Sequence, residues 1–199
     1  RMKYGSDESL ALAERIGRTL RDASYSASSD LAAEKGSFPA FDAGKYLEAN
    51  FVKTLPEALR EKIRSQGMRN VQLNTVAPTG TTSLSVGQNC SSGIEPIFAL
   101  SFRRTIRTGV GEETRAETVL DYAWRRWLEF SGSAQNGAGN AAHAEAPDFF
   151  ATTVDIDPYR SIDMQAVFQK YIDHSISKTL NLPPKTSFEE YKNLFMYGY

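Results

Sequence analysis

The chain has 199 residues, of which 41% are hydrophobic and 24% are charged, so residues 1–199 are enough to form one globular domain with a sizeable core. Lysine and arginine number 23 against 24 aspartates and glutamates, which gives a net charge of -1. A balanced charge of this kind creates no strong field that would attract polyanions. We therefore expect neither a nucleic acid nor a membrane as partner.

The only cysteine, Cys90, excludes an intrachain disulfide and a cysteine-rich zinc site. The histidines His143 and His174 have no neighbouring cysteine, so we expect no metal site. No apolar run approaches the roughly 20 residues that span a bilayer, and the first residues do not resemble a signal peptide, so we expect a cytoplasmic protein. The sequence starts at Arg1 rather than at methionine, which we interpret as the interior of a longer polypeptide.

Two helices are predicted in the first third of the chain. Ser6 is an N-cap residue followed by two acids, which predicts a helix over residues 6–34 that ends before Gly36. The apolar residues expected to form its buried face are Leu10, Ala13, Ile16, Leu20 and Ala23. A second, shorter helix is indicated by Leu55-Pro56 at its start and Gly67 just beyond its end.

The central part of the chain has the patterns of strands and loops. Apolar and polar residues alternate over residues 71–76, which predicts a half-buried strand. Residues 78–93 are rich in glycine, serine and threonine and are predicted to form a loop. A second strand is expected over residues 98–107, where apolar positions alternate with Ser101, Arg103 and Thr105.

The last third alternates again between helix and strand patterns. Residues 112–130 are expected to form a helix with acids in its first turn, and residues 131–146 a mobile loop of small residues. Helical spacing resumes over residues 162–171, a short strand is expected at 177–182, and a last helix at 187–199. This order indicates an α/β fold with crossover helices.

The segment most suggestive of chemistry follows the strand predicted at residues 71–76. Its backbone amides and hydroxyl groups are short neutral donors that would suit a phosphate, and a hydroxyl-rich turn is the other interpretation. No Gly-Lys-Ser/Thr follows, so the segment is not a Walker A loop. We expect Gly80 to supply a backbone conformation, or a close ligand approach, that only glycine permits. The candidate phosphate-binding residues are Ala77, Pro78, Thr79, Gly80, Thr81, Thr82 and Ser83.

Three stretches in the same order resemble one known family. The first motif is Gly-Met-Arg-Asn-Val-Gln-Leu-Asn-Thr-Val-Ala-Pro-Thr-Gly-Thr-Thr-Ser at residues 67–83, and the second is Ser-Ser-Gly-Ile-Glu-Pro-Ile-Phe at residues 91–98. The third motif consists of two runs, residues 164–173 and 175–183. Together they resemble the C-terminal part of the catalytic barrel of ribonucleotide reductases, and most of all the adenosylcobalamin-dependent class II enzymes.

The resemblance implies a fold, a reaction and a cofactor. The fold would be a fragment of a ten-stranded α/β barrel that contains its C-terminal strands and helices. Such enzymes reduce the 2'-hydroxyl of a ribonucleoside di- or triphosphate by radical chemistry that begins with a thiyl radical, and class II members use adenosylcobalamin. In the family the Ala-Pro-Thr-Gly-Thr segment holds the substrate phosphates, which corresponds to residues 77–83 here.

The family's catalytic cysteines are missing from this chain. Its Asn-x-Cys-x-Glu pattern is not matched at Cys90, which stands in an Asn-Cys-Ser-Ser-Gly run, and one thiol cannot be both radical carrier and redox pair. We therefore expect no catalytic residue here, and a chain that is inactive by itself. The remaining barrel segment, or a partner chain with those cysteines, would be its partner. Alternatively, the chain is a non-catalytic half of a split enzyme or a self-associating module, and exposed strand edges would favour a homodimer.

Other candidates have simpler explanations. Glu95 lies in the second motif, where it would order the loop or orient substrate, and the ordering role is favoured. Arg103 and Arg107 are expected on one strand face, where they would either contact a phosphate or carboxylate or form a solvated or ion-paired surface. Three acids, Glu112, Glu113 and Glu117, are explained by the dipole of the helix predicted there, and the two tryptophans, Trp124 and Trp127, by a core position.

Overall fold

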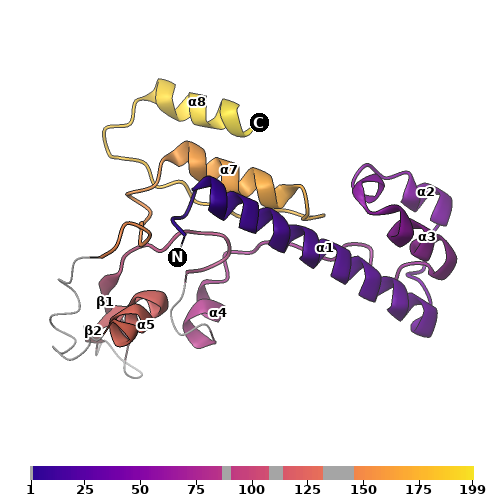
Figure 1. Cartoon of the computed structure of the whole chain (residues 1–199), viewed down its shortest axis with the longest axis horizontal. Coiled ribbons are helices and arrows are strands. Elements are labelled where there is room, and N and C mark those ends of the chain that lie inside the picture. The colour runs from indigo at the N-terminus through magenta and orange to yellow at the C-terminus, as the bar shows by residue number, and fades with distance from the viewer. Residues whose placement is uncertain (1, 87–90, 108–113, 132–145) are drawn as a thin grey trace. The chain divides into compact units, whose positions relative to one another are not determined.

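A computed structural model describes residues 2–86, 91–107, 114–131 and 146–199. The chain divides into two compact units. Unit 2 comprises Leu10–Ala77 and Met164–Ser177, and unit 1 comprises Arg1–Ser9, Pro78–Asp163 and Lys178–Tyr199. Figure 1 labels the helices and strands of both units. No helix in the described part of the chain is both long enough and apolar enough to cross a membrane.

Unit 2 is helical. Its elements are α1 (Asp7–Lys35, whose first residues belong to unit 1), α2 (Ala43–Leu47), the 3-10 helix η1 (Val52–Thr54) and α3 (Glu57–Gln66). Both helices predicted in this region are confirmed, since Pro56 precedes α3 and Gly67, at φ +86°, ends it with an N–H bond to the Ile63 carbonyl.

The predicted buried face of α1 is wrong at four of its five positions, since only Ala13 is buried. Ile16 and Leu20 are half exposed, whereas the buried positions follow a neighbouring stripe of mostly small or polar residues. Ser28 and Ser29 are buried on that stripe because their hydroxyls are hydrogen-bonded to the side chains of Asn70 and Gln66, at 3.0 and 3.2 Å. The apolar core of unit 2 consists of Tyr25, Leu47, Val52, Leu55, Leu59, Ile63 and Met68.

The two short strands predicted at 71–76 and 177–182 are not formed. One isolated parallel bridge joins Val76 to Ile176, with the Ser177 N–H donating to the Val76 carbonyl at 2.8 Å. The Asp173 carboxylate accepts the N–H groups of Leu73 and Asn74 at 2.9 and 2.8 Å. A side chain thus takes the backbone donors that a neighbouring strand would otherwise use, and the pairing stops after one bridge.

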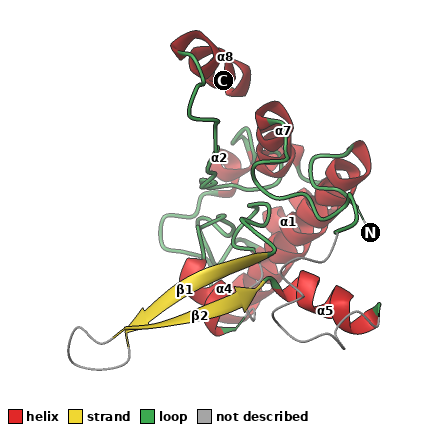
Figure 2. Ribbon diagram, turned by 90° about the vertical axis from the view of Figure 1, so that its left-hand side faces the viewer, coloured by secondary structure: helices red, strands yellow, loops and turns green. Residues whose placement is uncertain are grey.

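Unit 1 contains an antiparallel hairpin of β1 (Ser101–Arg107) and β2 (Thr114–Leu120), which Figure 2 shows in yellow. Its register pairs Ser101 with Leu120 and Arg107 with Thr114. The strand predicted at 98–107 is therefore confirmed from Ser101 onward. The helix predicted at 112–130 is wrong in its first half, because Thr114–Leu120 pairs with β1, and correct in its second half, α5 (Tyr122–Phe130).

The other helices among the described residues are α4 (Gly80–Ser85), α7 (Pro158–Gln169, shared between the units) and α8 (Phe188–Gly198). The last two confirm predicted helices, and α8 begins with a capping box between Ser187 and Glu190. The loop predicted over 131–146 lies almost entirely outside the described residues. Helices and strands are mixed as predicted, but the described sheet is a two-stranded antiparallel hairpin, without the parallel strands that crossover helices would join.

Candidate functional site

Residues 78–83 of the candidate phosphate loop belong to unit 1, whereas Ala77 is assigned to unit 2. Pro78 and Thr79 lead into α4, and residues 80–83 form its first part. The residue with left-handed backbone is Thr79, at φ +48°, and not Gly80. A Cβ added at Gly80 would meet nothing within 4 Å. The expectation that Gly80 supplies a glycine-only conformation is therefore wrong, since the sharp turn is made one residue earlier.

The hydroxyl groups of this loop fall into two classes. Thr79 Oγ1 accepts the Gly93 N–H at 2.8 Å, and Ser83 Oγ donates to the Gly80 carbonyl at 2.8 Å, so these two hold the loop itself. Thr81 and Thr82 are exposed, and their hydroxyls have no hydrogen bond among the described residues. Their backbone N–H groups lie in the first turn of α4, where a helix supplies no internal acceptor.

The second motif contains a tight turn, Ser92–Glu95, and each of its four residues takes part in a hydrogen bond. The Glu95 N–H donates to the Ser92 carbonyl at 3.0 Å and closes the turn. Gly93, at φ +58°, donates its N–H to Thr79. The Ile94 carbonyl accepts the hydroxyl of Tyr4 at 2.7 Å. The turn is thus bonded to the candidate phosphate loop on one side and to the N-terminal segment on the other.

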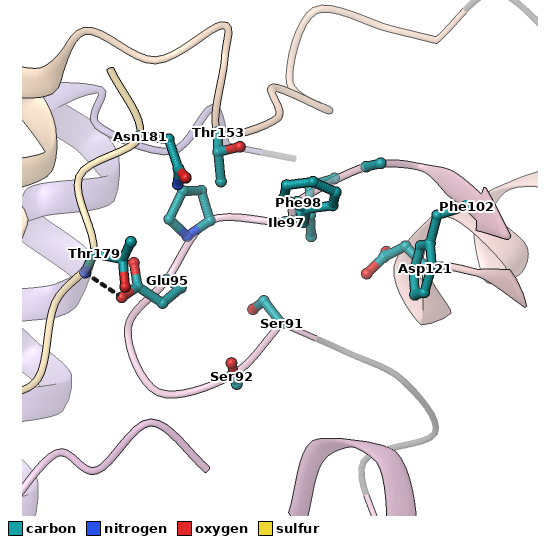
Figure 3. Close-up of a pocket in the computed structure, with 12 residues that line it drawn as sticks. Ser91, Ser92, Glu95, Ile97, Phe98, Phe102, Asp121, Thr153, Thr179 and Asn181 are labelled. Atoms are coloured by element: carbon teal, nitrogen blue, oxygen red, sulfur yellow. Dashed lines mark hydrogen bonds between the residues drawn. The ribbon is translucent and has the colours of Figure 1, made fainter. Parts of the chain in front are cut away.

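The carboxylate of Glu95 joins the second motif to the third. It accepts a hydrogen bond from Lys178 Nζ at 2.5 Å and from the Thr179 N–H at 2.6 Å, the latter drawn in Figure 3. The Lys178 side chain is only 3% exposed and that of Glu95 is 20% exposed, so the ion pair is largely shielded from water. Tyr4 covers it, with its ring centroid 6.0 Å from Nζ. Burial, assisted by the Glu95 charge, raises the pKa of the Tyr4 hydroxyl well above its usual range and keeps it neutral.

A pocket of about 300 Å³ lies beside this carboxylate (Figure 3). Its lining combines hydroxyl, amide and carboxyl groups with apolar side chains: Ser91, Ser92, Glu95, Pro96, Ile97, Phe98, Ala99, Phe102, Asp121, Thr153, Thr179 and Asn181. Asp121 caps α5 by accepting the N–H groups of Ala123 and Trp124, and burial raises the pKa of its carboxyl. Thr153 is 9% exposed, and its hydroxyl has no partner within the described ranges.

The structure places the predicted site residues in different positions. Glu95 lines the pocket, whereas residues 77–83 do not. Trp124 is buried at 1% exposure, as predicted, and Trp127 packs against it and Leu128. Glu117 lies on β2 and pairs with Arg115, so the helix dipole does not explain it. Arg103 lies exposed on β1, and His174 is exposed beside Ser175. Cys90, Glu112, Glu113 and His143 lie outside the described residues, as does the Arg107 side chain.

Two residues of the site were missed by sequence reasoning. Lys178 stands inside a quoted motif, in Ser-Lys-Thr, and Tyr4 stands near the N-terminus. Neither has a sequence neighbour that signals its role, because the partner carboxylate is 83 positions away from Lys178 and the carbonyl bound by Tyr4 is 90 positions away. Among the described residues there is also no cluster of three or more metal-ligating side chains.

The sequence matches one protein family and several known proteins. A family described as "Ribonucleotide reductase, barrel domain" matches residues 1–199. The vitamin B12-dependent ribonucleoside-diphosphate reductase of Thermoplasma acidophilum is 34% identical over 196 residues, which cover 94% of this chain and 23% of the relative. The enzyme of the same description from Mycobacterium tuberculosis is 32% identical over 202 residues, 97% of this chain and 26% of the relative. The ribonucleoside-diphosphate reductase large chain of Encephalitozoon cuniculi is 26% identical over 218 residues, the whole of this chain and 28% of the relative. The chain thus spans about a quarter of the length of these relatives.

Proposed function

Since this chain belongs to the barrel-domain family of ribonucleotide reductases, we propose that it works as part of an enzyme that reduces ribonucleotides to deoxyribonucleotides by radical chemistry. Its substrate would be a ribonucleoside di- or triphosphate. The family match over residues 1–199 and the Thermoplasma and Mycobacterium relatives, at 34% and 32% identity, support the proposal. In the complete enzyme, these residues would form the C-terminal strands and helices of a ten-stranded barrel.

The role proposed for this chain is to bind the substrate phosphates through residues 77–83. The observation that carries this proposal is the state of Thr81 and Thr82, which are exposed and whose hydroxyls have no hydrogen bond within the described residues. Hydroxyl and amide donors of this kind form strong hydrogen bonds to a charged phosphate oxygen. Thr79 and Ser83, by contrast, hold the loop in shape and leave those donors exposed.

The radical chemistry needs cysteines that this sequence does not supply. The chain has a single cysteine, Cys90, outside the family pattern, and it spans about a quarter of its relatives. We therefore propose that a further barrel segment, on the same polypeptide or on a partner chain, carries the catalytic thiols. A homodimer would be one way to cover exposed strand edges. We place the enzyme in the cytoplasm, where thiols are kept in the reduced state that the catalytic cysteines need.

Adenosylcobalamin is the cofactor proposed for the complete enzyme, because two of the relatives are named as vitamin B12-dependent. When bound, it would supply the radical that starts the reaction. The described part of this chain offers no cluster of metal-ligating side chains, and His174 is an isolated, exposed histidine bonded to Ser175. We assign no described residue of this chain to the cofactor.

Binding of inorganic pyrophosphate to the 199-residue chain tests the phosphate loop. Thr81→Val removes one exposed hydroxyl, and we expect the dissociation constant to rise about 5- to 30-fold, the equivalent of about 1 to 2 kcal/mol. Gly80→Val should weaken binding more, because its side chain would cover the amides of the first turn. It should do so without unfolding the chain, since a Cβ at Gly80 has open space.

Thr118→Val, on the exposed surface of β2, is the matched control and should bind as the unchanged chain does. Isothermal titration calorimetry measures the affinities, and circular dichroism checks that each variant is folded. Equal affinity in the Gly80 and Thr81 variants and the control, or no pyrophosphate binding by the unchanged chain, would return this loop to a hydroxyl-rich turn.

A further inference from the structure

We propose that Glu95 and Lys178 are positioning residues, whose ion pair holds the Ser92–Glu95 turn and, through it, the loop that binds phosphate. The effect of the pair on phosphate binding rests on the proposed function, but its effect on the order of the loop does not. It assigns a role to a buried lysine that does not itself line the pocket or reach the loop.

The first step is the geometry of the carboxylate. One oxygen of Glu95 accepts from Lys178 Nζ at 2.5 Å and the other from the Thr179 N–H at 2.6 Å. Two bonds to two oxygens fix both the position and the rotation of the carboxylate. The Glu95 side chain is thereby fixed to a segment that is more than eighty positions away in sequence.

The second step is the environment of the lysine. Its side chain is 3% exposed, so the ammonium exchanges few hydrogen bonds with water, and besides Glu95 it donates to the Thr179 carbonyl at 3.0 Å. Tyr4 lies over it and is kept neutral by burial. Removing the carboxylate alone would leave a buried charge without its counter-ion, which is strongly unfavourable. The cost of separating the two charges therefore keeps Glu95, and with it the turn, in place.

The third step links the turn to the loop. Glu95 closes the turn through its own N–H to the Ser92 carbonyl, and inside the turn Gly93 donates to Thr79 Oγ1. Thr79 is the one non-glycine residue in the described chain with a left-handed backbone, a conformation that a β-branched residue rarely adopts unaided. The bond from Gly93 stabilises it. Loss of the ion pair should therefore release Thr79 and, with it, the amides and hydroxyls that follow.

The test compares Glu95→Gln, Lys178→Met and the double variant. Backbone NMR relaxation at Gly93 and Gly80 reports loop order, pyrophosphate affinity reports function, and thermal unfolding reports stability. In the unchanged chain the two glycine amides should have order parameters of about 0.85, and in Glu95→Gln below about 0.6. The pyrophosphate dissociation constant should rise about tenfold.

The double variant removes both charges and with them the buried unpaired ammonium, so it should unfold at a higher temperature than Glu95→Gln, but without the ion pair the order at Gly93 should not return. Lys178→Met alone should be milder than Glu95→Gln, because the partly exposed carboxylate can be hydrated. The matched control is Arg126→Met with Glu129→Gln, an exposed pair on α5 at 2.6 Å, which should change none of the three readouts.

Two results would overturn the inference. One is a lower unfolding temperature in Glu95→Gln with unchanged order at Gly93 and Gly80, which would make the pair a structural ion pair only. The other is mobile glycine amides in the unchanged chain. If Glu95→Gln does not fold, the same relaxation measurement on Lys178→Met decides. Absence of pyrophosphate binding in every protein would contradict the proposed function, while the order parameters would still decide the role of the pair.

Discussion

The two units of this chain are stabilised in different ways. Unit 2 is built around an apolar core in which Ile63 and Met68 have no exposed surface. In the described part of unit 1, the corresponding cluster has only Trp124 and Leu128 buried, and its distant segments are joined instead by polar links such as Glu95 with Lys178. An apolar core fixes helices without offering groups to a ligand, whereas polar links leave hydroxyls, amides and carboxylates beside an accessible pocket. The motifs shared with the reductases are divided between the two units: residues 67–77, 164–173 and 175–177 lie in unit 2, and residues 78–83, 91–98 and 178–183 lie in unit 1.

The largest effect is expected from Ile63→Ala in unit 2. The side chain is fully buried, so its loss should lower the free energy of unfolding of this unit by about 2 to 5 kcal/mol. Ile16→Ala on α1 is the control, because that side chain is 50% exposed and its loss should cost no more than about 0.5 kcal/mol. Urea titration followed by circular dichroism measures both. Equal costs would mean that unit 2 does not depend on this core.

An intermediate effect is expected at Tyr25, where unit 2 combines its core with a polar link. The Tyr25 hydroxyl donates to Asp173 at 2.9 Å, so Tyr25→Phe should cost about 1 to 2 kcal/mol at neutral pH. Burial, with Tyr46 and Asp173 adding to it, raises the pKa of Tyr25 well above its usual range, and burial raises that of Tyr46 to about 12. Raised values mean that the folded state holds these protons more tightly than the unfolded state.

The stability that Tyr25 and Tyr46 contribute to unit 2 should therefore be fully present below pH about 10, the ordinary pKa of tyrosine, and should be lost as the pH rises through their higher folded-state pKa values. Tyr25→Phe should make this alkaline loss shallower, and Tyr191→Phe, at an exposed position on α8, should not. Urea unfolding at neutral and alkaline pH measures the difference. An alkaline slope unaffected by Tyr25→Phe would assign the loss to other groups.

Local signals predicted the elements whose ends are determined by adjacent residues. Pro56 and Gly67 mark the ends of α3, and Ser187 with Glu190 starts α8. The failures arise where a distant partner decides. Residues 114–120 form a strand because β1 lies opposite them, and Leu73 gives its N–H to Asp173 rather than to a strand. In the site, Glu95 was found from its motif, but Lys178 became visible only once the fold brought it to the carboxylate.

The smallest effect is expected at Thr153, and its sign tests whether unit 1 contains an unsatisfied polar group at its pocket. The Thr153 N–H is bonded to the Ile97 carbonyl at 2.9 Å, but its buried hydroxyl has no partner in the described part of the chain. Thr153→Val keeps the shape and removes the cost of burying that hydroxyl, so the free energy of unfolding should rise by up to about 1 kcal/mol. Thr152→Val is the matched control, because Thr152 Oγ1 donates to Asp155 at 2.7 Å and its loss should lower stability by about 0.5 to 1.5 kcal/mol. Thermal and urea unfolding of both variants give the sign. If Thr153→Val loses as much stability as Thr152→Val, the hydroxyl is already satisfied in the free protein, and the pocket holds no spare hydrogen-bonding group at this position.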